Sequence, residues 1–314
     1  MLRFAARRLI IAVPVLALVS LLSFAVIFLI PGDPASAFVD ASATPQQLAQ
    51  IRHRLGLDEP FYLQAIAWYG RVLRGDLGQS ILLNRSVTAA IIERLPVTLS
   101  LTSLALVLAA CLGIAAGLVA SVKHRSWADQ SIMVLALLGL SIPEFWLGLV
   151  LIFTFAVRLH WFRAGDYVPV TVSLSGWWQG MALPAFTLAA VQIGFIARMT
   201  RSSMLEVLSQ DFIRTAEAKG LPKRLVVGRH GLSNALVPIL TVLGIVTGSL
   251  LGGAVVIEQV FSLPGVGRLV IGAVLSRDFP VIQGTLLFVA LIYLLINLCV
   301  DMLYAAVDPR VRLQ

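Results

Sequence analysis

Few residues in this sequence have the type and spacing that catalysis would require. No Gly-rich turn ends in Gly-Lys-Ser/Thr, and neither His-Glu-x-x-His nor Gly-x-Ser-x-Gly occurs. Gly139-Leu-Ser141 places a serine in an apolar stretch, but a serine nucleophile needs a base within hydrogen-bond reach. Because no apolar stretch carries a central histidine or lysine, an intramembrane hydrolase is disfavoured. Any work that the protein performs must draw its energy from another chain or from a gradient.

The cysteines and histidines do not suggest metal or disulfide chemistry. Cys111 and Cys299 lie inside apolar stretches and do not cluster with other ligands, so each is interpreted as a small buried apolar residue. All four histidines fall in predicted loops or at interfaces, which disfavours a proton path through a bilayer. We predict no metal and no cofactor.

Two carboxylates, Glu144 and Glu258, are candidates for a gate or for the substrate path. Ionisable residues inside a membrane are rare and are functional hypotheses by default. Both lie near the ends of predicted spans or in outer turns, however, so a local structural role is the simpler interpretation. Asp301 lies close to the inner interface and is expected to cap a helix or to pair with a cation.

The polar stretch 198–234 contains the most informative local pattern. Asp211 can cap a short helix, Lys219 closes it against the negative end of the helix dipole, and Gly220 suits the left-handed position that follows. Pro222 fits the first turn of a second helix. The pattern predicts a helix from Asp211 to Lys219 and then a sharp turn. Such a helix is too short to be stable alone, so the helices behind it or a partner must hold it.

Composition and charge spacing place these residues in a membrane protein. The chain of 314 residues is 59% hydrophobic and 13% charged, whereas a soluble domain carries about 25% charged residues. Asp, Glu, Lys, Arg and His are absent from 9–32, 95–122, 167–197, 231–257 and 279–300. A helix needs about 20 apolar residues to cross a bilayer, and a soluble core helix need not stay uncharged on every face.

About six transmembrane helices are predicted. They lie near residues 9–30, 96–122, 130–157, 181–197, 235–256 and 281–305, and the third is interrupted at Ser141-Ile-Pro-Glu144. The polar segment 31–95 contains helical stretches from Pro45 to Leu55 and from Pro60 to Leu73. The run from Leu263 to Ser276 is too short to span and is expected to be interfacial or re-entrant.

Small residues in two of these helices predict close packing. Gly113 and Gly117 form a Gly-x-x-x-Gly pair, and Gly244, Gly248 and Gly252 recur on one stripe of the fifth helix. Without bulky side chains, helix backbones approach one another closely in a membrane. A packing role is the simplest interpretation of all five glycines.

The basic residues predict an orientation. Six crossings place both chain ends on one side, together with the loop between the fourth and fifth helices. That side carries fourteen Lys and Arg against six Asp and Glu, an excess equal to the net charge of +8, while the other side balances. The positive-inside rule therefore predicts cytoplasmic termini and an outer segment 31–95. The basic composition then reflects topology, and no nucleic-acid partner is expected. Contact with lipid headgroups is the alternative role for the loop 198–229.

The loop also resembles that of a known family. Asp211-Phe-Ile-Arg-Thr-Ala-Glu-Ala-Lys-Gly220, Arg229-His230 and Asn234-Ala-Leu-Val-Pro238 resemble the "EAA" loop of binding-protein-dependent ABC importer permeases. The family's Glu-Ala-Ala falls on Arg214-Thr215-Ala216, and the Gly-to-Pro spacing is longer than the general pattern. Both departures resemble the dipeptide, oligopeptide and nickel subfamily, which reads Arg-Thr-Ala-x-Ala-Lys-Gly here.

Further motifs resemble that subfamily along the whole chain. They are Pro31-Gly-Asp33, Leu55-Gly-Leu-Asp58-x-Pro60, Gly75-Asp-Leu-Gly78-x-Ser80, Arg94-Leu-Pro96-x-Thr98-Leu99, Ser141-Ile-Pro-x-Phe-Trp146, Glu258-x-Val-Phe261 with Pro264-Gly-x-Gly267, and Asp308-Pro-Arg310. Each motif is weak alone, whereas seven in order are specific. The long outer insertion resembles the first, B-type, permease of such heterodimers.

The resemblance implies an all-α integral membrane protein with the type I ABC importer permease architecture. It implies a cytoplasmic N-terminus and first helix at 1–30, a periplasmic segment at 31–95, a permease core at 96–305 and a cytoplasmic tail at 306–314. The loop 198–234 would contain the coupling helix, which in this family sits in a groove of the ATPase subunit. Its residues would be Arg214, Thr215, Ala216, Glu217, Ala218, Lys219 and Gly220.

The same resemblance implies the partners and the mechanism. A second, C-type permease, one or two ABC ATPase subunits and a periplasmic substrate-binding protein would complete an importer in the bacterial inner membrane. ATP binding would close the ATPase pair, carry the coupling helix along and drive alternating access for a peptide. Nickel and glutathione importers share the pattern and stay open as alternatives. A gradient-driven secondary transporter is the main rival, but its paired repeats and mid-membrane ionisable residues are missing here.

Overall fold

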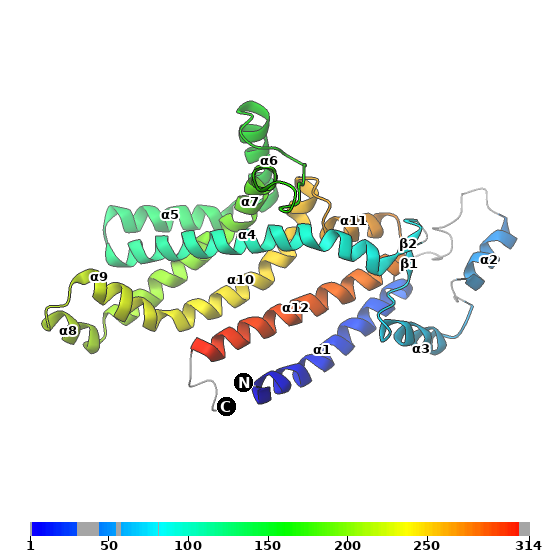
Figure 1. Ribbon diagram of the computed structural model, residues 1–314, viewed down its shortest axis with the longest axis horizontal. Coiled ribbons are helices and arrows are strands. Elements are labelled where there is room, and N and C mark those ends of the chain that lie inside the picture. The colour runs from blue at the N-terminus through cyan, green and yellow to red at the C-terminus, as the bar shows by residue number, and fades with distance from the viewer. Residues whose placement is uncertain (1, 30–43, 55–57, 81, 308–314) are drawn as a thin grey trace. The chain divides into compact units, whose positions relative to one another are not determined.

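The computed structural model describes residues 2–29, 44–54, 58–80 and 82–307, and they are predominantly helical (Figure 1). The motifs Pro31-Gly-Asp33 and Asp308-Pro-Arg310, and the first three residues of the motif that ends at Pro60, lie outside this part of the chain. The chain divides into two compact units. One is built mainly from Val97–Leu263, and the other from Ala6–Pro96 and Pro264–Leu295.

The first unit is a bundle of long helices centred on α7. Its elements are α4 (Val87–Val122, from Val97 onward), α5 (Trp127–Ser141), α6 (Glu144–Leu151), the π-helix η2 (Ile152–Arg158), α7 (Leu174–Leu208), α8 (Asp211–Ala218), α9 (Lys223–Leu225), the π-helix η3 (Val226–Leu232) and α10 (Ser233–Val260). Helix α7 packs against α5, α6 and α10. The apolar core includes Leu101 of α4, Leu188 of α7 and Leu250 of α10.

The second unit brings together segments from both halves of the sequence. Its elements are α1 (Leu2–Leu29, from Ala6), α2 (Pro45–Arg54), α3 (Phe61–Val72), β1 (Gln79–Ser80), β2 (Arg85–Ser86), the first turns of α4, α11 (Val266–Leu275) and α12 (Phe279–Val307, as far as Leu295). Helices α2 and α3 confirm the two helical stretches predicted in the outer segment. Buried side chains of α4, α11 and α12, including Ile91, Leu269 and Ile282, form the core.

A small antiparallel hairpin is hydrogen-bonded to the turn before α12. Strand β1 pairs with β2, and the Ser80 hydroxyl donates a hydrogen bond to the buried carboxylate of Asp278. Burial raises the pKa of the Asp278 carboxyl, and the hydrogen bonds from Ser80 and from the Val281 backbone N–H oppose that rise. Strands of two residues give no hydrophobic alternation, so the sequence did not predict this hairpin.

Among the described helices, five of the six predicted membrane spans are confirmed as candidates. Helices α4, α7 and α12 and the continuous stretch Lys223–Val260 are each long and apolar enough to cross a membrane, and α5 with α6 and η2 makes a bent fifth candidate. Helix α1 is also continuous, and it carries no ionisable residue from Leu9 to its end at Leu29. Helix α11 has ten residues, too few to span, as predicted.

Predicted ends of α4 and α7 are wrong, and α7 begins at Leu174 rather than near Met181. Helix α4 begins at Val87 rather than at Pro96, because Val87, Ala90 and Ile91 are buried in the core of the second unit and extend the helix past the proline. Helix α7 continues to Leu208 rather than ending near Ala197. No glycine or proline follows Ala197 before the extended backbone of Gln210. Charged residues begin after Ala197, but the helical conformation continues.

The third predicted span is broken as the sequence indicated. Helix α5 ends at Ser141, α6 begins at Glu144, and the two helical parts are bent by 102° (Figure 1). Ile142 has φ −84° and ψ 126°. Proline at position 143 pushes the residue before it out of the α-helical region, because its ring would clash with that residue.

Three of the five predicted packing glycines make close helix contacts. A Cβ added to Gly117 would lie 2.5 Å from the carbonyl oxygen of Ala197, and one added to Gly113 or Gly244 would lie 2.7 Å from Ile196 Cβ or Val300 Cγ1. Gly252 makes no such contact within the described part of the chain, because a Cβ there would have no atom of these residues within 4 Å. The next residue, Gly253, is the one that faces a neighbouring helix.

A buried ion pair joins the start of α5 to α7. The carboxylate of Asp129 accepts hydrogen bonds from Arg201 Nε at 2.6 Å and from Arg201 Nη2 at 2.8 Å. The backbone N–H of Arg125 donates to Asp129 Oδ2 at 2.9 Å, and His124 Nδ1 lies 3.1 Å from Arg201 Nη2. The pair therefore closes the α4–α5 turn against the part of α7 that leads to α8.

The contact of Gly117 generates a stability prediction. Gly117→Ala should destabilise the α4–α7 packing by about 1–3 kcal/mol, since overpacking forces shifts of the neighbouring backbone. Gly252→Ala is the matched control, and it should be neutral or slightly stabilising because alanine favours a helix. Thermal unfolding of the detergent-solubilised proteins, followed by circular dichroism, measures both. Equal melting temperatures for the two variants would contradict the contact.

The ion pair generates a second prediction. Arg201→Met should destabilise the bundle by roughly 1–3 kcal/mol, less than for a fully buried pair because Arg201 is partly exposed. The variant would leave the buried Asp129 carboxylate with the Arg125 N–H and His124 alone. Arg198→Met, which changes an exposed arginine one turn earlier on α7, is the control. The same unfolding measurement should separate the two variants, and an unchanged Arg201→Met would show that the pair contributes nothing.

Candidate functional site

The candidate site is the segment that follows α7. Helix α7 ends at Leu208, Gln210 takes an extended backbone, and α8 begins at Asp211. The predicted capping role of Asp211 is wrong, because Gln210 holds the capping position and makes no side-chain capping bond. Asp211 lies in the first turn instead, where its carboxylate favours the positive end of the helix dipole. Arg214 Nη1 lies 3.4 Å from Asp211 Oδ1, at the exposed surface.

The end of α8 is a tight left-handed turn. Gly220 has φ +77°, as predicted. Its N–H donates to the carbonyl of Glu217 at 2.9 Å, and the N–H of Leu221 donates to the carbonyl of Ala216 at 3.3 Å. These two bonds form a Schellman motif, which satisfies carbonyls that the helix end would otherwise leave unpaired. Pro222 precedes α9 rather than lying in its first turn, one position earlier than predicted.

One face of α8 is held by the chain itself. Ile213 and Ala216 are buried with Val226 of η3, and Leu208 and Leu221 pack against them. Helices α8 and α9 lie together at one end of α7 and α10 (Figure 1). The sequence indicated that either the helices behind α8 or a partner must stabilise it. The helices of the chain itself supply one of these two supports.

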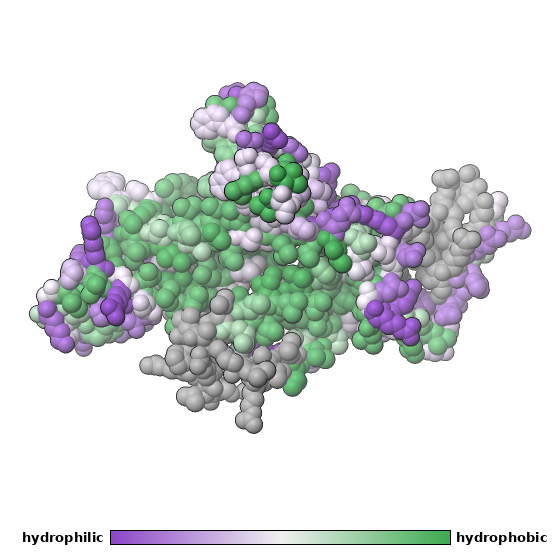
Figure 2. All heavy atoms as spheres, viewed as in Figure 1, coloured by the Kyte–Doolittle hydropathy of each residue, from purple (hydrophilic) through white to green (hydrophobic). Residues whose placement is uncertain are grey.

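The other face of α8 is exposed and polar. Phe212, Arg214, Thr215, Glu217 and Ala218 are exposed. Among the predicted coupling residues only Ala216 is buried, so it supports the helix and does not face outward. Figure 2 shows hydrophilic side chains gathered over α8 and α9, whereas hydrophobic side chains cover the neighbouring lengths of α4, α5 and α10. Helix α8 is packed on one side and exposed on the other. A displacement of a partner bound to its exposed side can therefore be transmitted to α7 and α10.

The two predicted carboxylates both lie along α10. Glu258 is fully buried and accepts a hydrogen bond from Thr98 Oγ1 at 2.6 Å. Glu144 is half-buried at the start of α6, and a Cβ added to Gly253 of α10 would lie 3.0 Å from its Oε2. Gly253 and Glu258 are separated by about 7.5 Å along the helix axis. The two carboxylates can therefore have different roles. Glu258 is buried and can hold α10 against α4, whereas Glu144 is more accessible at the helix break and can contact a solute.

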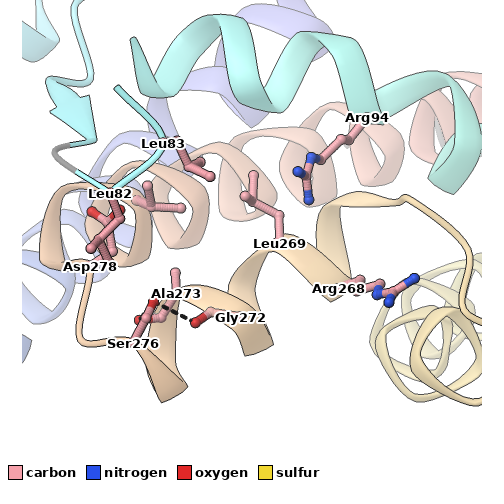
Figure 3. A pocket seen from close by; sticks show the side chains of 10 residues that line it. Leu82, Leu83, Arg94, Arg268, Leu269, Gly272, Ala273, Ser276 and Asp278 are labelled. Carbon is pink, nitrogen blue, oxygen red and sulfur yellow. Dashed lines mark hydrogen bonds between the residues drawn. The ribbon is translucent and has the colours of Figure 1, made fainter. Parts of the chain in front are cut away.

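The second unit contains a pocket that the sequence did not predict. Its volume is about 320 Å³, and it lies among the hairpin turn, α4, α11 and the start of α12. Figure 3 shows the guanidinium groups of Arg94 and Arg268 at one end, leucines 82, 83 and 269 in the middle and Asp278 at the other end. Arg94 begins the motif Arg94-Leu-Pro96-x-Thr98-Leu99 and Arg268 directly follows Pro264-Gly-x-Gly267, but no periodic signal shows that these motifs meet.

Comparison with known proteins identifies the family to which this sequence is similar. The family model described as "Binding-protein-dependent transport system inner membrane component" matches residues 109–313, and a model for the N-terminal part of such membrane components matches residues 1–102. A putative peptide transport system permease protein of Brucella abortus is 48% identical over 301 residues, with 96% of each chain covered.

Other relatives match almost end to end. The dipeptide transport system permease protein DppB of Alkalihalophilus pseudofirmus is 42% identical, with 99% of this chain and all of that one covered. The glutathione transport system permease protein GsiC of Escherichia coli is also 42% identical, with 99% of each chain covered. Among solved structures, an inward-facing MetNI methionine ABC transporter matches with a TM-score of 0.55 at 19% identity, covering 67% of this chain and 93% of that one. That likeness concerns the fold alone. The resemblance noted in the sequence is confirmed, and the chain belongs to the family of inner membrane components of binding-protein-dependent transport systems.

Proposed function

We propose that this chain is a transmembrane permease subunit of an ATP-driven importer, and that it forms half of the translocation pathway for peptides. The observation that carries the proposal is α8, a short helix with one face packed on Val226 and the other exposed at the end of α7 and α10. Relatives that match the chain over nearly its whole length are named as peptide or dipeptide permeases.

The partners follow from what the chain lacks and from its family. The sequence contains no phosphate-binding loop, so separate ATPase subunits, one or two in kind, would supply the energy. A second, C-type permease would complete the pathway, and a periplasmic substrate-binding protein would deliver the peptide. Membrane lipid surrounds the spans. The bacterial inner membrane is the proposed location, with both termini cytoplasmic.

The fold suggests how movement would pass through this subunit. ATP binding would draw the ATPase pair together and carry the exposed face of α8, from Arg214 to Gly220. Its buried face transfers that displacement to Leu208 of α7 and to Val226, which leads into α10. Because α7 and α10 pack against one another, the two would move as a body. Glu144 lies beside α10 at the helix break and is proposed to line the substrate path, whereas Glu258 is proposed to hold α10 to α4 as a gate element.

A glutathione importer is the second candidate. The Escherichia coli glutathione permease and the dipeptide permease have the same sequence identity to this chain. Glutathione is itself a small peptide. Nickel importers share the subfamily motifs. Uptake assays with labelled dipeptides, oligopeptides, glutathione and nickel, in the presence of the cognate binding protein, distinguish these substrates.

The topology is testable with single cysteines. Cys111 and Cys299 are exposed in this chain, so the burial expected from the sequence is wrong and both are replaced by serine. In that background, Gln79→Cys and Ser209→Cys change exposed positions in the outer segment and in the coupling loop. An impermeant maleimide added to whole spheroplasts should label the first and not the second, since the positive-inside rule places the basic loop in the cytoplasm. Labelling of both positions from outside would contradict the proposed orientation.

The coupling role is tested at Gly220. Gly220→Val forces a β-branched residue into a left-handed conformation, which costs about 1–3 kcal/mol, so the turn should shift and α8 should present another face. Uptake should fall steeply while membrane insertion stays normal. Gly228→Val is the matched control, because a Cβ at either glycine would meet no atom within 4 Å and only Gly220 has positive φ.

The measurements are peptide uptake and co-purification of the ATPase subunits with each variant. Normal uptake by Gly220→Val would remove the coupling role. If the loop instead served only to bind lipid headgroups, neutralising Arg214, Lys219, Lys223 and Arg224 together would impair the protein more than Gly220→Val does.

A further inference from the structure

Helix α3 is packed against the end of α1 (Figure 1). The hydroxyl groups of Ser20 and Tyr69 form a hydrogen bond of 3.1 Å. The Phe24 ring lies 5.1 Å from the Phe61 ring and 5.7 Å from the Trp68 ring, measured between centroids. Trp68 is only 6% exposed. Aromatic packing and a satisfied hydroxyl pair therefore fix α3 beside two residues of α1.

These contacts set the depth of α3. Ser20 lies near the middle of the uncharged run 9–29 of α1, and Phe24 lies in its second half. Gln283 Nε2 of α12 also reaches this region, where it donates to the carbonyl of Phe24 at 3.2 Å. In a membrane protein, a helix that packs against such a run lies at the level of the bilayer and not far out in water.

The side chains of α3 divide around its axis. Successive residues are about 100° apart. Phe61 and Trp68, which contact Phe24, fall within one sector, and Tyr69, which bonds to Ser20, lies at the edge of that sector. The next sector holds Tyr62, Ile66 and Leu73, which are 63%, 66% and 87% exposed.

The sector on the opposite side holds Gln64, Ala67 and Arg71. No acidic residue occurs between Phe61 and Gly75, whereas Arg71 and Arg74 lie at the end of the helix. An exposed apolar sector on one side of a helix, with basic residues on the other side and at its end, matches the pattern of helices that lie in a membrane interface. It also suits anionic lipid headgroups.

We propose that α3 is an interfacial membrane helix, which inserts Tyr62, Ile66 and Leu73 among lipids and anchors the outer segment to the bilayer beside Ser20 and Phe24 of α1. Its length of about 18 Å would lie along the membrane plane. Lipid is the occupant that the contacts favour, because the apolar sector adjoins the face packed on a membrane span. The inference is independent of the substrate that the protein carries.

Spin labels on neighbouring residues test the proposal. Ile66→Cys and Ala67→Cys, in a Cys111→Ser, Cys299→Ser background, place labels one residue apart in the apolar and polar sectors. The assembled transporter is reconstituted in nanodiscs of phosphatidylethanolamine and phosphatidylglycerol, and collision with oxygen and with a soluble nickel chelate is measured. Oxygen accessibility should exceed nickel accessibility several-fold at position 66, and the order should reverse at position 67.

Each other outcome contradicts the proposal in a different way. Nickel accessibility that exceeds oxygen accessibility at both positions would place α3 in water. Low accessibility to both reagents at position 66 would show that another protein covers the apolar sector. As a second measurement, Ile66→Asp should shift a label at Leu73→Cys from oxygen toward nickel accessibility, whereas Ala67→Asp should not. An equal response to the two aspartates would also overturn the interfacial placement.

Discussion

The packing of α7 is the constraint on which the first unit depends. This helix is buried by α5, α6 and α10 along most of its apolar length, and small residues allow the close approach. Gly194 shows how close, because a Cβ there would lie 2.5 Å from the carbonyl oxygen of Ala136 on α5. Lipid is as apolar as the helices themselves, so contact between surfaces, rather than exclusion of water, holds such a bundle together. A rigid α7 then provides the base from which α8 projects.

Local sequence signals predicted the features that local chemistry determines. The glycine turn after α8, the break before Pro143 and the helices α2 and α3 each depend on a residue with a strong backbone preference or on a short periodic pattern. The family resemblance then suggested the role that we propose for α8, whereas composition and spacing alone would have left this segment as a basic loop. Most of the fold and the place of the candidate site were therefore accessible from the sequence.

Features that depend on distant contacts were not accessible. A proline can begin a helix or lie within one, and the burial of Ile91 in another part of the chain decides that α4 continues past Pro96. The pairing of Asp129 with Arg201 joins residues far apart in sequence, and neither residue carries a local signal of its partner. Asp211 was misplaced by one position, because a polar residue near a helix start can cap it or occupy its first turn equally well.

The π-helix η3 has a consequence for the length of the coupling loop. Between Gly220 and Pro238 the chain is longer than in the general family pattern, and η3 occupies Val226–Leu232 within that interval. A π-helical turn closes over one more residue than an α-helical turn, so it takes up added chain as a local widening. One residue of added chain is taken up in this way inside the helix, and α10 continues from Ser233 without an intervening loop. Deleting one residue from η3 would therefore convert the π-helical turn into an α-helical turn. The side chains of α10 would stay in register with α9, so η3 is a place where this segment can change length without turning α10.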